Sequence, residues 1–221
     1  MNTALQTQST LTRLPTLKLE DDRIIVGALL KYVDNRTPAW ARHDGVPLRP
    51  EAAYLGLAIR RANQRFIDQR PEVITEKPGE KLADVDTLNA QIPETEWPIG
   101  LTGQPEAPWK REYIVHMIDT IDLSILTFSN HTIGAKRAVL DLEEKMQWAA
   151  ALYGSDIMPL FTLGEAPFQT AYGLRKRPVF TLIGWRRFTG GALRIVDQSA
   201  PALDTVKPKP VSADLRDNLP F

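Results

Sequence analysis

The chain contains no cysteine. Disulfides, thiolate metal sites and a cysteine nucleophile are therefore excluded, and a reducing compartment fits this composition. Histidine is scarce too, because His43, His116 and His131 stand far apart and form neither a His-x-x-x-His pair nor a zinc-finger pattern. His116 lies in an apolar stretch, which favours a hydrogen-bonded core histidine over a metal ligand. No cofactor is predicted.

Long apolar runs are missing as well. None approaches the ~20 residues that a membrane helix needs, and the first eight residues have neither the basic nor the apolar part of a secretory signal. We therefore expect a cytoplasmic protein.

Sequence motifs of catalysis are also missing. The chain has no Gly-x-Ser-x-Gly elbow, no phosphate-binding loop and no Gly-x-Gly-x-x-Gly fingerprint. The nearest carboxylate group, Glu143 and Glu144 with Asp141, falls on the polar face of a predicted helix. We expect a protein that is not an enzyme, and we keep a metal-dependent nuclease as an alternative.

Charge is balanced over the whole chain, with 27 basic and 27 acidic residues. It is not balanced locally. Residues 166–196 contain no acid and six cations, namely Arg175, Lys176, Arg177, Arg186, Arg187 and Arg194. A net charge of zero thus conceals a basic segment of the kind that contacts phosphates.

The residue pattern predicts one folded domain over residues 21–189, preceded by a flexible leader (1–20) and followed by a flexible tail (190–221). Strands are expected at 23–33 with a bend at Gly27, and at 54–59, 73–75, 113–118, 124–128, 157–163 and 178–188. A helix-like stretch is expected after residue 59 to about 69. Pro159 places its strand at a sheet edge.

The clearest helix spans about 134–152, with apolar residues at spacings of three and four, and Gly154 ends it. One helical turn is expected near 84–90. Together these elements predict a β-rich α+β fold, an oligonucleotide-binding (OB-like) barrel with insertions, one main helix and disordered ends.

The basic segment is interleaved with aromatic residues. Single-stranded nucleic acid requires this combination, because cations follow the phosphates while rings stack on the bases. Two smaller clusters have the same character. The predicted nucleic-acid-binding residues are Lys31, Tyr32, Trp40, Trp109, Lys110, Arg111, Arg175, Lys176, Arg177, Trp185, Arg186 and Arg187. For each ring taken singly, a place in the β core is the competing interpretation.

The chain ends in an apolar, proline-stiffened tip, Asp217-Asn218-Leu219-Pro220-Phe221. A free C-terminal carboxylate beside a phenylalanine is a recognised docking element. This tip resembles the acidic, Pro-Phe-ending tail of bacterial single-stranded DNA-binding proteins, although Arg216 and Asn218 interrupt the acidic run. The resemblance implies that Asp217, Leu219, Pro220 and Phe221 recruit replication or recombination enzymes.

The middle of the chain resembles uncharacterised proteins of phages and prophages, at residues 84–89 and 97–103 and at Arg177, Pro178 and Phe180. The leading hypothesis is therefore a single-stranded DNA-binding protein of a phage or mobile element. The first alternative is a protein-interaction or inhibitor module without nucleic-acid affinity. The sequence leaves homo-oligomerisation open.

Overall fold

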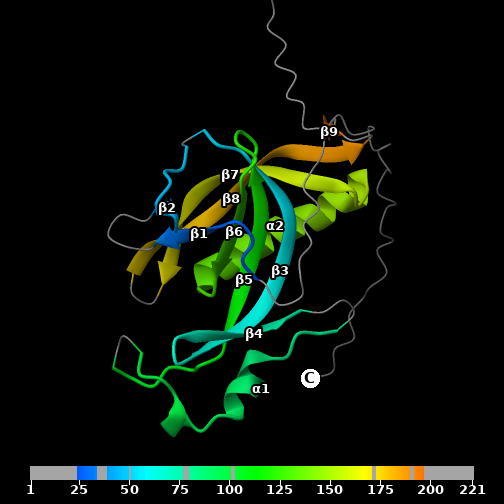
Figure 1. The fold of residues 1–221 in the computed structure, drawn as a ribbon. Helices are drawn as coiled ribbons and strands as arrows, with labels where there is room; N and C mark the ends of the chain where they lie inside the picture. Colours follow the sequence, from blue (N-terminus) through cyan, green and yellow to red (C-terminus); the bar gives the residue numbers. More distant parts are fainter. Residues whose placement is uncertain are drawn as a thin grey trace, which may run out of the picture.

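In the part of the chain that the structure describes, the fold is one mixed sheet of nine strands, accompanied by two α-helices and one short 3₁₀ helix (Figure 1). It is seen in a computed structural model that describes residues 24–33, 39–49, 51–76, 80–100, 103–170, 173–189 and 192–196. The predicted β-rich α+β class is confirmed.

In chain order the elements are β1 (Ala28–Val33), β2 (Ala39–Arg42), β3 (Tyr54–Ile67), β4 (Arg70–Thr75), α1 (Val85–Ala90), η1 (Glu94–Glu96), β5 (Lys110–Asp119), β6 (Ile125–Asn130), α2 (Ile133–Tyr153), β7 (Ile157–Thr170), β8 (Gly173–Thr189) and β9 (Ala192–Ile195).

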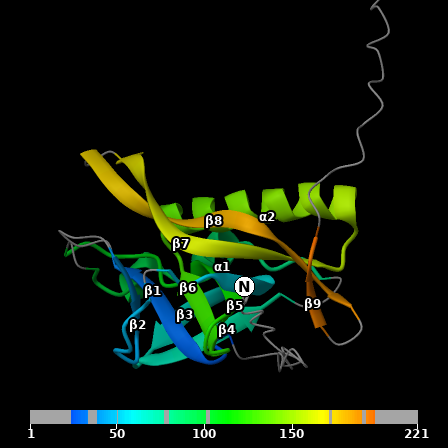
Figure 2. The same ribbon diagram turned by 90° about the horizontal axis from the view of Figure 1, so that it is seen from above.

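The strand order in the sheet is β2-β1-β6-β5-β3-β7-β8-β9, and β4 pairs with β3 outside this path. β3, β5 and β6 are antiparallel neighbours, although β4 lies between β3 and β5 along the chain, and α2 then carries the chain to β7, which returns to lie beside β3. β1 is parallel to β6. Figure 2 shows α2 along one side of the β7–β8 hairpin, which extends beyond its neighbouring strands.

The core brings the two ends of the sheet together through side chains. Trp40 of β2 lies with its ring 5.2 Å from the ring of Phe128 and 5.7 Å from that of Phe180. Its Nε1–H donates a hydrogen bond to the Gly164 carbonyl at 2.8 Å. The sheet therefore curls around the main apolar core, although no backbone pairing between described residues joins β2 to β7 or β8.

The main helix agrees with its prediction. The Thr132 side chain accepts a hydrogen bond from the Ala135 N–H, which caps the start of α2. Its buried face includes Ala135, Val139 and Leu142, at the predicted spacing. Gly154 follows the last turn at φ 92°, a conformation that glycine adopts without strain.

The helix-like stretch expected before residue 69 is wrong, because β3 continues through it as a strand to Ile67. There β3 pairs with β5 on one side and β4 on the other. The expectation that Pro159 places its strand at a sheet edge is wrong, because β7 lies inside the sheet between β3 and β8. The backbone pairing of β7 with β3 is limited to Leu160 and Phe161, so Pro159 pairs only with β8, while its ring lies against Gly56 of β3.

The β5–β6 hairpin, β8 and the turn-length α1 lie where they were predicted. β9 lies past residue 189, where we expected the folded domain to end, and it pairs with β8. The expected leader and most of the expected tail fall outside the described residues. No helix in the described part of the chain is both long and apolar enough to cross a bilayer.

Candidate nucleic-acid interface

The central part of the candidate interface is the hairpin of β7 and β8, whose strands pair continuously from Ile157 and Arg187 to Thr170 and Gly173. The register shifts once, at Leu160 and Phe161, where β8 has the extra residue Ile183. We call the section beyond the core, residues 165–170 with 173–177, the basic arm. It has three cations and one carboxylate, and Arg175 and Lys176 are exposed on it.

Acids from other elements neutralise part of the basic segment. Arg177 pairs with Asp141 of α2 at 2.9 Å, and Arg187 pairs with Asp156 at 2.8 Å. Lys176 pairs with Glu165 across the arm. The absence of acids within residues 166–196 therefore does not mean that these cations are unpaired.

Three cations remain available to a ligand: Arg175 and Lys31, which were predicted to bind, and Arg194, which belongs to the basic segment. Arg175, Arg194 and Lys31 are exposed and have no ion pair with any residue that the structure describes. Arg186 is half-buried and donates from Nη1 to the Trp185 carbonyl at 2.9 Å. The strongest free charge of the basic segment thus lies on the arm and on β9.

The four predicted stacking rings pack into the protein. Trp185 is buried with Ala149 and Ile157 between the end of α2 and the β7–β8 hairpin. Tyr32 is buried in the main core, with its ring 5.4 Å from the half-buried Trp40. This placement favours the core role for these rings.

Two of the three predicted clusters meet. The Tyr32 hydroxyl donates to Glu165 at 3.4 Å, and Glu165 also pairs with Lys176, so the β1–β2 cluster adjoins the basic arm. Lys31 points from the same strand, on the opposite side from Tyr32.

The third cluster lies elsewhere, at the start of β5 beside α1. Trp109 is buried there, and Lys110 pairs with Glu106 at 2.7 Å. Arg111 donates to Asn63 Oδ1 and to the Ala83 carbonyl, each at 2.7 Å. These bonds use Lys110 and Arg111 to hold the long connection between β4 and β5 against the sheet.

Sequence reasoning missed the tip of the β3–β4 hairpin. Phe66 is 64% exposed and Ile67 48% exposed, next to Arg70, which is exposed and has no ion pair with a described residue. This is one of two places in the described chain where an aromatic ring stands in solvent, the other being Trp148 on α2 at 68%. The tip was missed because its residues were assigned to a helix, where the same side chains would form no tip.

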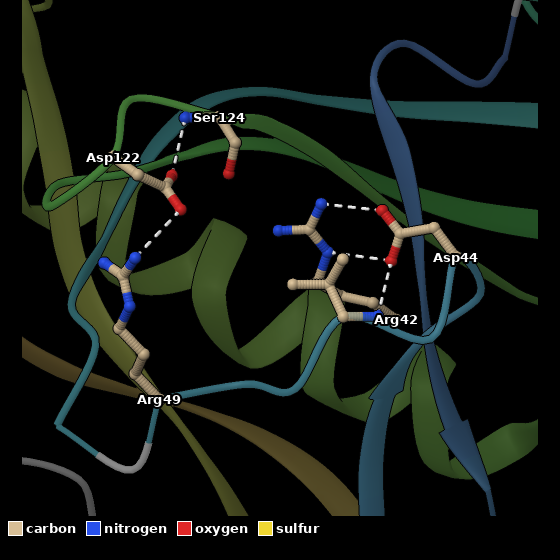
Figure 3. A network of polar contacts seen from close by, with 6 residues as sticks. Arg42, Asp44, Arg49, Asp122 and Ser124 are labelled. Carbon is tan, nitrogen blue, oxygen red and sulfur yellow. Dashed lines mark hydrogen bonds and ion pairs between the residues drawn. The ribbon is translucent and has the colours of Figure 1, made fainter.

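The acids between β5 and β6 shape a turn, as predicted. Asp119 accepts a hydrogen bond from the Ile121 N–H, and Asp122 accepts one from the Ser124 N–H at 2.9 Å. Asp122 also pairs with Arg49 at 3.4 Å, beside a second pair of Arg42 and Asp44 at 2.7 Å (Figure 3). Each acid in this network thus has a local partner.

Tyr54 is buried and lies close enough to this network for its charges to act on the phenol. Burial raises the pKa of its hydroxyl to about 12, and the negative charge of Asp119 acts in the same direction. Tyr54 therefore stays neutral at physiological pH. Among the described residues, no group of three or more histidine or carboxylate side chains is arranged to hold a metal ion.

The expected docking residues Asp217, Leu219, Pro220 and Phe221 lie outside the described residues. A scan of the chain against protein-family models found no match, and neither did the searches of curated proteins and of solved structures.

Proposed function

We propose that the chain binds single-stranded DNA without catalysing a reaction, using an OB-like barrel whose basic arm follows the phosphates. The fold part of the proposal rests on strand order. With β4 set apart as an insertion, β3, β5 and β6 follow one another as antiparallel neighbours, and β7 returns by way of α2 to lie beside β3. This is the Greek-key order, and the OB fold is a partly open Greek-key barrel of five strands. β8 supplies the fifth strand.

The curled core supports the same assignment. In a barrel the last strand approaches the strands on the far side of the sheet, and here Phe180 of β8 packs against Phe128 of β6 with ring centroids 5.5 Å apart. β1 and β2 occupy the gap where these strands would otherwise meet, with Trp40 in contact with both rings. We therefore regard β1 and β2 as an addition to the barrel.

The observation that carries the binding proposal is the position of Arg175 and Lys176. OB folds hold oligonucleotides partly with the loop between their fourth and fifth strands, which here is the basic arm. Exposed cations on a projecting hairpin attract phosphates over a Debye length of about 10 Å. They do so despite the net charge of zero, because Arg175 has no ion pair with any described residue and the surface pair of Lys176 with Glu165 is weak.

A phage or mobile-element setting, and recruitment of replication or recombination enzymes through the C-terminal tip, complete the proposal. Both rest on the sequence resemblances. The alternative, a protein-interaction module without nucleic-acid affinity, is favoured by one observation. Three of the six cations of the basic segment are already paired with acids.

A fluorescence anisotropy titration with labelled oligo-dT of about 16 nucleotides tests the proposal. We expect saturable binding at low salt that weakens as salt rises, because phosphate contacts release counterions. A duplex of the same length should compete poorly. Absence of binding at low salt would refute the proposal, and a protein partner that co-purifies after nuclease treatment would then support the alternative.

A further inference from the structure

The tip of the β3–β4 hairpin is a two-residue turn with an unusual surface. Asp68 and Gln69 both have positive φ, 48° and 65°, as tight hairpin turns between twisted strands require. The last two residues before the turn are Phe66 and Ile67, both apolar and both exposed. The two turn residues are polar, as is usual, but the strand residues beside them expose two large apolar side chains, and this pair needs an explanation.

The hairpin is held firmly below its tip. Ala62 at its base is fully buried, and Val73 packs beside it. Further out, Arg65 pairs with Glu72 at 2.5 Å and lies 4.7 Å over the ring of Trp109.

Trp109 is itself fixed by α1. The Asn89 side chain accepts a hydrogen bond from the Trp109 N–H at 2.9 Å and donates one to its carbonyl at 3.1 Å. The tip therefore extends from a part of the hairpin that Arg65, Trp109 and Asn89 hold in place.

The tip differs from an ordinary docking surface because it has an exposed apolar side chain on each of its two faces. Phe66 lies opposite Pro71, and Ile67 lies opposite Arg70. Because neighbouring residues of a strand point to opposite faces, Phe66 and Pro71 occupy one face and Ile67 and Arg70 the other. A flat partner would cover only one face. The geometry suits a ligand that the tip enters, with apolar material on both sides and an anion near Arg70.

Stacked nucleobases meet this description. Apolar side chains such as Phe and Ile act as wedges between base steps in other DNA-binding proteins, and the separated bases then cover both sides of the wedge. We propose that the β3–β4 tip is a wedge that inserts at the junction between single-stranded and duplex DNA, with Phe66 stacking on the exposed base pair and Arg70 contacting a phosphate. This inference rests on the proposed function and extends it from coating a strand to opening a duplex end.

A forked DNA, with a single-stranded arm of about 16 nucleotides next to a duplex, tests the wedge when a fluorescent adenine analogue occupies the junction. We expect the wild-type chain to bind the fork more tightly than oligo-dT and to change the junction fluorescence. Phe66→Ala should weaken fork binding at least about fivefold, as loss of one stacked base does, and abolish the fluorescence change. Phe66→Tyr should restore both.

The matched control is Trp148→Ala, which removes an equally exposed ring from α2. It should leave fork binding within twofold of wild type. Phe66→Ala should also leave oligo-dT binding within twofold. An unchanged fork affinity for Phe66→Ala would overturn the wedge while leaving the proposed function intact, as would equal losses on fork and oligo-dT. Failure of the wild-type chain to bind either DNA would overturn both.

Discussion

At the scale of single residues, His116 is the clearest case of a side chain whose protonation is fixed by its neighbours. The Thr127 hydroxyl donates its one proton to the Val26 carbonyl at 2.7 Å and accepts a hydrogen bond from the Val26 N–H at 2.9 Å. His116 Nδ1, 3.1 Å from the same oxygen, must therefore be the donor of that bond. These hydrogen bonds join Val26, in the segment before β1, to Thr127 of β6 and through it to His116 of β5.

His116 should make the stability of the fold depend on pH. Burial lowers the pKa of its imidazole from 6.5 to about 4, and the positive charge of Arg60 adds to this effect. The unfolded chain therefore takes up the proton first. Stability should be complete above about pH 6.5 and fall by about 3 kcal/mol as the pH is lowered to 4.

Urea unfolding between these pH values, compared with the same series for His116→Gln, measures this contribution. Glutamine does not titrate in this pH range, so the curve of this variant should fall less steeply toward low pH. His43→Gln, at an exposed histidine, should follow the wild type. Parallel curves for wild type and His116→Gln would contradict the assignment.

At the scale of elements, Gly27 determines whether β1 can lie against β6. Its φ is 71°, and a Cβ there would lie 2.0 Å from the Ile125 carbonyl oxygen. Gly45 has a similar φ, 77°, but open space around it. Gly45→Ala should therefore cost about 1 kcal/mol, the strain alone. Gly27→Ala must also separate the strands, and we expect at least about 3 kcal/mol.

Urea midpoints of the two variants check this comparison, because the glycines share their backbone conformation and differ in their surroundings. Loss of Gly27 should also loosen Leu30 and Tyr32, which β1 places in the core. Equal destabilisation by the two substitutions would show that β1 does not depend on its contact with β6.

The elements that sequence could predict are those with a local signal. α2 has an apolar face of helical period and a terminal glycine, and the β5–β6 hairpin has turn-forming aspartates. The second half of β3 has no such signal, because the hydrogen-bond and ion-pair partners of its polar residues are far away in the sequence. Arg61 pairs with Glu143 of α2, and Asn63 donates to the Ala83 carbonyl. Partners at such separation leave no local pattern.

The same reason limits what could be predicted of the candidate interface. The basic segment was found from its composition, and its exposed arm follows from strand pairing. The ion pairs of Arg177 and Arg187 come from α2 and the turn after it, which a window along the chain does not contain. The exposure of Phe66 depends on the β3–β4 turn, and so it could not be recognised while that stretch was assigned to a helix.

At the scale of the whole molecule, a neutral chain can bind a polyanion only if its positive charge is separated from its negative charge. The basic arm is the candidate for this separation, because it projects beyond the neighbouring strands (Figure 2) and has three cations for one carboxylate of its own, with Arg177 also paired with Asp141 of α2. The ion pair of Lys176 with Glu165 lies at the surface, so a phosphate can replace Glu165 at a small cost in free energy. The salt dependence of binding therefore reports whether the arm is used.

Replacing both Arg175 and Lys176 by alanine should make the plot of log affinity for oligo-dT against log salt less steep by about 1.4, since each phosphate contact with a single strand contributes about 0.7. The fold should remain, because both side chains are exposed. The matched control replaces Lys81, in the connection before α1, and Lys145, on α2, two exposed lysines without an ion pair to any described residue. It removes the same formal charge but should keep the wild-type slope. Equal slopes for the arm variant and the wild type would mean that DNA binds elsewhere, whereas equal changes in both variants would mean that only total charge matters.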